Sequence, residues 1–132
     1  MDFVSIRIIT ADVARLVAFY ERATSVQASW ANDDFAELRT TSATLAIAST
    51  RTVGLFAPGS AQPADNRSVI IEFRVDDVDS VHQNLTGFVE DFVNEPTTMP
   101  WGNRALLFRD PDGNLVNFFT PVTASAIEKF AR

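Results

Sequence analysis

The sequence contains no cysteine and a single histidine, His82, among its 132 residues. The lack of cysteine excludes disulfides, thiolate metal sites and a cysteine nucleophile. A single imidazole also argues against zinc sites, Ser-His triads and histidine acid–base pairs, which usually need more than one histidine or one that is well placed. His82 lies at the edge of the apolar stripe of a predicted helix, so we expect it to face solvent rather than to act as a base.

Positive charge is scarce as well, with 11 Lys and Arg against 17 Asp and Glu and a net charge of −6. This balance argues against nucleic acid, which requires clustered basic residues, and against an anionic membrane surface. No apolar run is long enough to cross a bilayer. The opening residues MDFVSIRIIT lack the basic region and long apolar core of a signal peptide. We therefore expect a cytoplasmic protein with no nucleic-acid or membrane partner.

Hydrophobic residues are plentiful, at 46% of the chain with 11 phenylalanines, and the length suggests one domain. The patterns predict the same order of elements twice, each time a strand, a helix and three strands. The first half has strands at 3–9, 26–30, 35–39 and 45–48, with a helix that Asp12 caps. The second has strands at 69–75, 88–93, 104–108 and 115–119, with a helix that Asp77 caps.

Individual residues also match between the halves. Asp12 corresponds to Asp77 at an offset of 65, and Arg39 corresponds to Arg109 at an offset of 70. Coincidence between two amphipathic stretches is the alternative, but element order and residue matches agree on a duplication. The predicted organisation is one domain of two tandem βαβββ modules. Its parts are module 1 at 1–50, a Gly- and Pro-containing linker at 51–67, module 2 at 68–121 and a C-terminal helix at 122–132.

Three stretches of the chain resemble the vicinal oxygen chelate superfamily, which includes glyoxalase I, fosfomycin and bleomycin resistance proteins, and extradiol dioxygenases. They are SIRIITADVARLVAFYERATSV, VIIEFRVDDVDSVHQNL and WGNRALLFRDPDGNLVNFFTP. The resemblance implies an α+β fold of two βαβββ modules whose curled mixed sheets surround a cavity. It also implies a homodimer, and the modules could pair within one chain or between two chains.

In metal-dependent members, the resemblance implies ligands on the first and last strand of each module. These positions fall on Ser5, Ile47, Ile70 and Asn117, where Asn117 takes the place of a glutamate. Two of these side chains are apolar and two are neutral, so together they bind a divalent ion too weakly to replace the water that the ion would lose. We therefore expect no metal and no other cofactor.

Without a metal, the cavity must bind its ligand through shape, aromatic faces and a few polar groups. The predicted ligand-binding residues are Ser5, Arg7, Trp30, Phe35, Glu37, Phe56, Glu72, Trp101, Asn103, Asn117 and Phe119. Trp101, between Pro100 and Gly102, is expected at the pocket rim. The duplicates Arg7 and Glu72 carry opposite charges and could pair, more as a structural salt bridge than as a ligand clamp.

Three functions follow from these expectations. The first is a binding protein of the bleomycin-resistance type that holds a small, partly planar organic molecule in an aromatic cavity. The second is a metal-independent lyase or isomerase with a buried carboxylate base, Glu37 or Glu72. The third is a lyase or dioxygenase whose metal ligands lie at other positions. The sequence does not separate the first from the second and identifies no catalytic residue.

Overall fold

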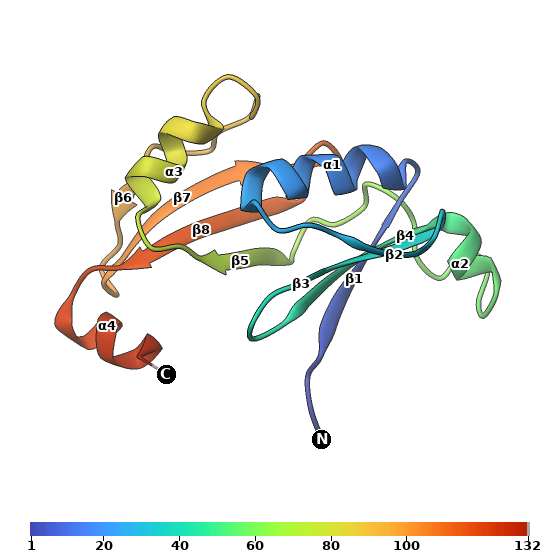
Figure 1. Cartoon of the computed structure of the whole chain (residues 1–132), viewed down its shortest axis with the longest axis horizontal. Helices are drawn as coiled ribbons and strands as arrows, with labels where there is room; N and C mark the ends of the chain where they lie inside the picture. Colours follow the sequence, from blue (N-terminus) through green and yellow to red (C-terminus); the bar gives the residue numbers. More distant parts are fainter. Residues whose placement is uncertain (132) are drawn as a thin grey trace. The chain divides into compact units, whose positions relative to one another are not determined.

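The computed structural model describes residues 1–131, so Arg132, the end of the predicted C-terminal helix, lies outside the described residues. The chain divides into two compact units, Met1–Asp65 and Asn66–Arg132. Each unit contains one open, four-stranded mixed sheet with its helices (Figure 1). The boundary falls inside the segment predicted as a linker. That the two units form one domain stays a prediction.

The N-terminal unit has the sheet order β1-β4-β3-β2, with β1 parallel to β4 and the other pairs antiparallel. Its elements are β1 (Ser5–Thr10), α1 (Val13–Thr24), β2 (Ser29–Asn32), β3 (Phe35–Arg39), β4 (Thr44–Ser49) and α2 (Thr50–Gly54). Asp12 caps α1 as predicted, because its carboxylate accepts a hydrogen bond from the Arg15 amide. The short helix α2 occupies the start of the segment that was expected to be only a loop.

The C-terminal unit repeats the arrangement with the order β5-β8-β7-β6. Its elements are β5 (Ile70–Arg74), α3 (Val78–Leu85), β6 (Thr97–Thr98), β7 (Asn103–Arg109), β8 (Leu115–Pro121) and α4 (Ala124–Phe130). Asp77 caps α3 by accepting from the amides of Asp79 and Ser80. The predicted α+β fold of two βαβββ modules is thereby confirmed.

The strand predicted at 88–93 is wrong. The amides of Phe88 and Val89 instead donate to the carbonyl of Leu85 and wrap the chain around the end of α3. The edge of β7 is satisfied partly by a side chain, since Asn94 Oδ1 accepts from the Leu107 amide at 2.7 Å. Residues 97–98 then form the much shorter strand β6. Only the end of the predicted run pairs with β7, because the Arg109 amide donates to the Asp91 carbonyl and the Val93 amide donates to the Leu107 carbonyl.

Each sheet has one face covered by a helix and one face that we call its open face. In the N-terminal unit, α1 covers the face that carries Ala36, Leu38 and Ile47, all of which are 0–1% exposed. Strand alternation places the neighbouring side chains on the opposite side. The open face of this sheet carries Ser5, Arg7, Ile9, Thr44, Ala46, Ala48, Phe35, Glu37 and Arg39.

In the C-terminal unit, α3 covers the face formed by Leu106, Phe108, Val116 and Phe118. The rings of Phe108 and Phe118 meet edge to face at 5.0 Å. The open face carries Ile70, Glu72, Arg74, Asn103, Ala105, Leu107, Arg109, Leu115, Asn117 and Phe119. The helix α4 lies on the other side of β8 from α3 and covers one end of this open face (Figure 1).

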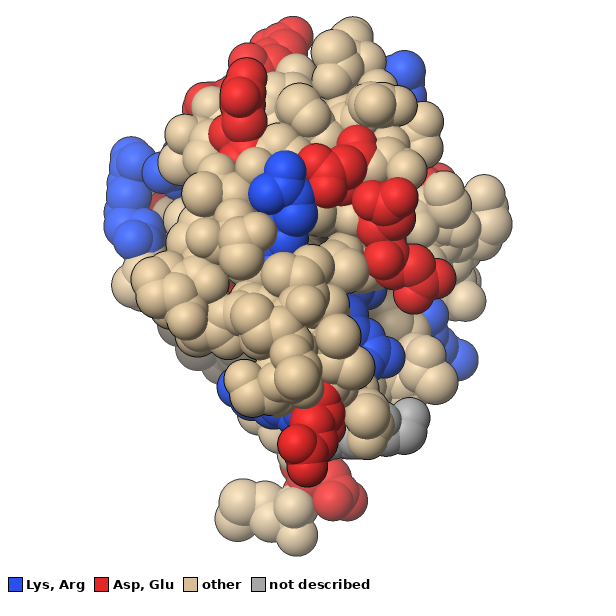
Figure 2. Space-filling model, turned by 90° about the vertical axis from the view of Figure 1, so that its left-hand side faces the viewer, with Lys and Arg blue, Asp and Glu red and all other residues tan. Residues whose placement is uncertain are grey.

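Figure 2 shows the distribution of charge on one face of the molecule. On the face shown in Figure 2, blue basic side chains are separated by red acidic and tan side chains, without a continuous basic patch. Nucleic-acid binding depends on such a patch. Within residues 1–131, no helix combines the length and apolar character needed to span a bilayer.

The turn between β7 and β8 is built around one buried carboxylate, that of Asp110, which is 5% exposed. Asp110 Oδ1 accepts from the amides of Asp112 and Asn114, and Oδ2 accepts from Asn114 Nδ2. Gly113 adopts a φ of +83°, which residues with a side chain rarely tolerate. These bonds fix where β8 starts, and therefore which of its side chains reach the open face.

We expect Asp110→Ala to lower the free energy of unfolding by about 2–4 kcal/mol, because three donors lose their acceptor in a buried turn. Urea denaturation measures the change. The exposed Asp65 provides the control, and Asp65→Ala should change the stability by no more than about 0.5 kcal/mol. Equal effects of the two substitutions would contradict the structural role given to Asp110.

Candidate functional site

The open face of the N-terminal unit has a charged and aromatic centre. Arg7, Ala46 and Glu37 form one row across β1, β4 and β3. The guanidinium carbon of Arg7 lies 5.5 Å from the ring centroid of Phe35 and 6.0 Å from that of Phe56. At these distances the cation is attracted to both ring faces. Because the Ala46 side chain is small, it leaves space above the sheet between the Arg7 guanidinium and the Glu37 carboxylate.

The helix α2 positions Phe56, and Asp34 holds the start of α2. Asp34 Oδ1 accepts from Ser49 Oγ at 2.8 Å and from Arg51 Nε at 2.9 Å. Val53 of α2 is buried in a cluster with Ile9 and Ala48. The chain turns directly after this helix, so that the exposed Phe56 ring lies over Arg7. Arg51 and Ser49 hold the pKa of Asp34 below its ordinary value by hydrogen bonding to the charged form.

Two other predicted site residues share this face. Ser5 lies exposed at the start of β1. Glu37 is half-buried and forms a salt bridge of 3.0 Å with Arg39. The Arg39 guanidinium thus occupies one oxygen of this carboxylate.

The open face of the C-terminal unit has a polar centre made of Glu72 and Asn117. Asn117 Nδ2 donates to Glu72 Oε2 at 2.8 Å. The carbonyl oxygen of Asn117 is buried and accepts no hydrogen bond from the described residues, and Asn103 Oδ1 is in the same condition. A buried oxygen without a donor costs about 1–3 kcal/mol, which an incoming N–H or O–H group would recover.

The remaining aromatic candidates do not gather around these centres. Trp30 is paired with Ala36, so the register places it on the face that α1 covers, at the edge of the sheet. Trp101 is 68% exposed in the turn between β6 and β7, where Gly102 adopts a φ of +96°. Phe119 does belong to the open face, but it is 6% exposed because Phe130 of α4 packs on it at 5.1 Å.

One predicted metal-ligand position is misplaced by one residue. Ile47 pairs with Ile8 and Ala36 and is fully buried beneath α1, whereas Ala46 lies opposite Arg7. The structural counterpart of Asn117 is therefore Ala46. The cause is loop length, because the β7–β8 turn at 110–114 is one residue longer than the β3–β4 loop at 40–43. One inserted residue reverses the face of every side chain that follows.

The corrected set of positions fits a divalent metal no better than the predicted one. Ser5, Ala46, Ile70 and Asn117 supply one hydroxyl, one amide and two apolar side chains. Residues 1–131 contain no group of three or more His, Cys, Asp or Glu side chains that could hold a metal ion. Hydroxyl and amide groups alone are weak ligands for the transition metals. The donor chemistry of this chain thus does not match the metal centre of its metal-dependent relatives.

His82 is half-buried rather than solvent-facing. Its ring packs edge to face on Phe92 at 5.1 Å. It lies on α3, on the side of the sheet away from the open face. A role in packing is therefore consistent with its position, and a catalytic role on the open face is not.

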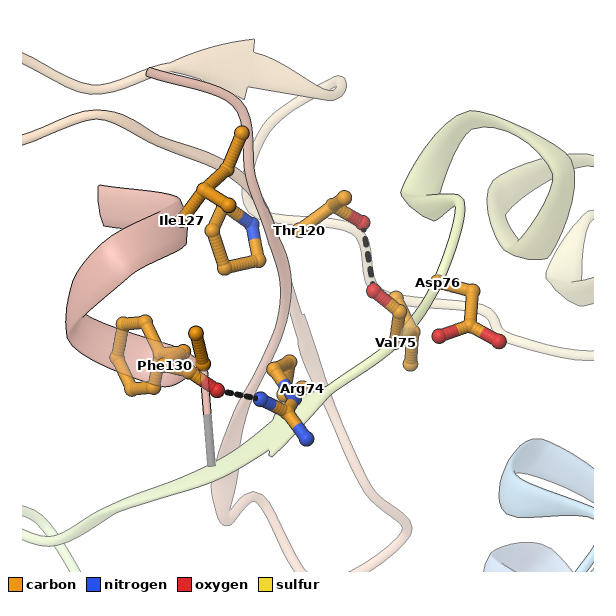
Figure 3. Close-up of a pocket in the computed structure, with 8 residues that line it drawn as sticks. Arg74, Val75, Asp76, Thr120, Ile127 and Phe130 are labelled. Carbon is orange, nitrogen blue, oxygen red and sulfur yellow. Dashed lines mark hydrogen bonds between the residues drawn. The ribbon is translucent and has the colours of Figure 1, made fainter. Parts of the chain in front are cut away.

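A groove of about 280 Å³ lies where α4 meets the ends of β5 and β8. Figure 3 shows Arg74 donating to the carbonyl of Phe130, and Thr120 donating to the carbonyl of Val75. The hydroxyl of Thr120 also accepts from the Val78 amide. These polar groups are already used to attach α4 and the start of α3. Arg74 was not among the predicted residues, although the offset of 65 from Ile9 would have placed it on the open face.

The fold and its open faces define an α+β protein built from repeated βαβββ modules. Residues 2–118 match the model of the Glyoxalase/Bleomycin resistance protein/Dioxygenase superfamily, and the chain belongs to this family. The predicted family is thereby confirmed. Among curated proteins, none matches the chain significantly.

Solved structures with the same fold are numerous. A glyoxalase/bleomycin resistance protein/dioxygenase from Nocardioides is 20% identical with a TM-score of 0.76, covering 94% of this chain and 85% of that one. A family enzyme from Burkholderia phytofirmans is 18% identical with a TM-score of 0.79, covering 92% and 100%. A protein of unknown function from Agrobacterium tumefaciens is 24% identical with a TM-score of 0.78, covering 91% and 94%. These similarities show the fold.

The attachment of α2 predicts a pH dependence. The folded pKa of Asp34 lies below its ordinary value of 3.8, so its contribution to stability is present above that pH and is lost as the pH falls through the folded pKa. We expect wild type to melt at a higher temperature than Asp34→Asn at pH 7. The difference should shrink once the pH drops below 3.8. A difference in melting temperature that stays constant down to the lowest pH would show that charge is not involved.

Proposed function

We propose that this protein binds a small, partly planar organic molecule on the open faces of its sheets, by aromatic stacking and hydrogen bonding and without a metal. The observation that carries the proposal is the composition of these faces. They present phenylalanine rings, an arginine and an amide at and around the positions where metal-dependent relatives carry ligands. Such groups recognise shape, ring faces and hydrogen-bonding pattern.

The exposed position of the Phe56 ring supports the proposal, because a ring at this position adds little to the buried core. Phe56 is 66% exposed, although burying an aromatic side chain is strongly favourable. It lies over Arg7, which orients it toward the open face. An exposed ring held beside the Arg7 guanidinium is a surface on which a planar molecule can stack.

The open face of the C-terminal unit has its own hydrogen-bonding group, the amide of Asn117. Its Nδ2 is occupied by Glu72, while its Oδ1 is buried without a donor. A ligand N–H or O–H group directed at this oxygen would remove the cost of leaving it unsatisfied. Because this oxygen has no accessible surface while Glu72 holds the amide, a ligand would reach it only by rotating the Asn117 side chain.

The proposed role is to hold the ligand, as in the bleomycin-resistance type of the family, rather than to transform it. No observation favours a carboxylate base, because Glu37 is paired with Arg39 and Glu72 is exposed within its own unit. A homodimer and a cytoplasmic location complete the proposal, and both derive from the family resemblance and composition.

Thermal denaturation against a panel of planar aromatic drugs and metabolites tests the proposal. A true ligand at 100 times its Kd should add about 2.7 kcal/mol to the free energy of unfolding. The same compounds should be recovered unchanged after incubation with the protein. A ligand that is consumed with turnover would replace the binding role by an enzymatic one.

The ligand found in this way should bind Phe56→Ala about 2- to 13-fold more weakly, because a stacked ring is worth about 0.5–1.5 kcal/mol. Leu55→Ala is the matched control, since Leu55 is the adjacent residue and is 86% exposed. Isothermal titration calorimetry gives both affinities. Unchanged binding by Phe56→Ala would place the ligand elsewhere than on the open face of the N-terminal unit.

A further inference from the structure

The open faces carry a charge opposite to that of the whole chain. The protein has a net charge of −6, yet its open faces hold four arginines and two glutamates. These residues are Arg7, Arg39, Arg74, Arg109, Glu37 and Glu72. In an acidic protein, cations placed on the faces proposed to bind a ligand indicate that the ligand is negatively charged.

Three of these arginines already have partners. Arg39 pairs with Glu37 at 3.0 Å. Arg74 donates to the carbonyl of Phe130, and Arg109 donates to the carbonyl of Gly113 at 3.0 Å. Arg7 differs from them. Within its own unit it makes only ring contacts, with no ion pair or hydrogen bond to its guanidinium among the described residues.

Its surroundings prepare Arg7 for binding an anion. Contacts with Phe35 and Phe56 restrict the guanidinium without using its N–H donors. A planar guanidinium with free donors matches the two oxygens of a carboxylate. Phe56 lies close enough to receive the ring that carries this carboxylate, and Ala46, next to Arg7 in the row, leaves space above the sheet.

We propose that the ligand is a planar aromatic carboxylate whose acidic group is held by Arg7 and whose ring stacks on Phe56. This inference rests on the proposed function and specifies the class of molecule that the site selects.

Two probes of the same shape test the charge requirement, 2-naphthoate and its neutral amide, 2-naphthamide. Isothermal titration calorimetry with the full chain should show 2-naphthoate binding roughly tenfold or more tightly, since a hydrogen bond to a charged group is worth about 1.5–3 kcal/mol. If both probes bind equally, the anion inference is wrong and the proposed function stands. If neither binds at millimolar concentration, the anion inference is contradicted, while the thermal-denaturation panel decides the proposed function separately.

Substitutions then test whether Arg7 causes the preference for 2-naphthoate over 2-naphthamide. Arg7→Gln should abolish the advantage of 2-naphthoate over 2-naphthamide, and Arg7→Lys should reduce it, because lysine keeps the charge but lacks the planar fork. Arg15→Gln, at an exposed position of α1 away from the open face, changes the net charge of the chain equally and should leave the advantage intact. Circular dichroism confirms that each variant is folded. Preservation of the advantage in Arg7→Gln, or its equal loss in Arg15→Gln, would overturn the assignment to Arg7.

Discussion

The structure depends on the alternation of side chains along strands that a helix covers on one side only. In each unit, one helix takes the apolar residues of one face into the core, as Leu38 and Ile47 show in the N-terminal sheet. The neighbouring residues in sequence must then point to the other side. The same register that buries the core therefore decides which polar residues share the open face. Core packing and ligand recognition are two consequences of one constraint.

This constraint explains why one residue of loop length matters so much. The turn held by Asp110 and Asn114 is one residue longer than the loop at 40–43, and the extra residue changes the repeat offset on the last strand. As a result Asn117 and Ala46, rather than Asn117 and Ile47, occupy equivalent places. The first module thus carries a small residue at this position of its open face, and the second carries an amide.

Much of the fold could be predicted from the sequence because its signals are local. Asp12 and Asp77 cap their helices, and the DPDGN turn closes its hairpin, through contacts within a few residues. The strand predicted at 88–93 failed because Phe88 and Val89 turn around the end of α3, so that only residues 91–93 pair with β7, and the Asn94 side chain makes the next contact across 13 residues. Such a contact leaves no periodic signal in the chain.

The candidate site was harder to predict for the same reason. Arg7 and Glu37 alternate clearly with apolar neighbours, so their shared face follows from the pattern. The position of Phe56 over Arg7 does not, because it depends on α2, which Asp34 holds from the preceding hairpin. The coverage of Phe119 by Phe130 likewise depends on where α4 packs. Sequence patterns therefore identified the residues of the sheets but not what lies over them.

The central claim is that these open faces hold an organic ligand through stacking and hydrogen bonds, with no chelated ion. Quantitative elemental analysis of the protein, purified without a histidine tag and without chelators, tests it most directly. The account predicts zinc, iron, manganese and nickel far below one ion per chain, and a melting temperature that EDTA does not change. One tightly held ion per chain, whose removal lowers the melting temperature, would contradict it.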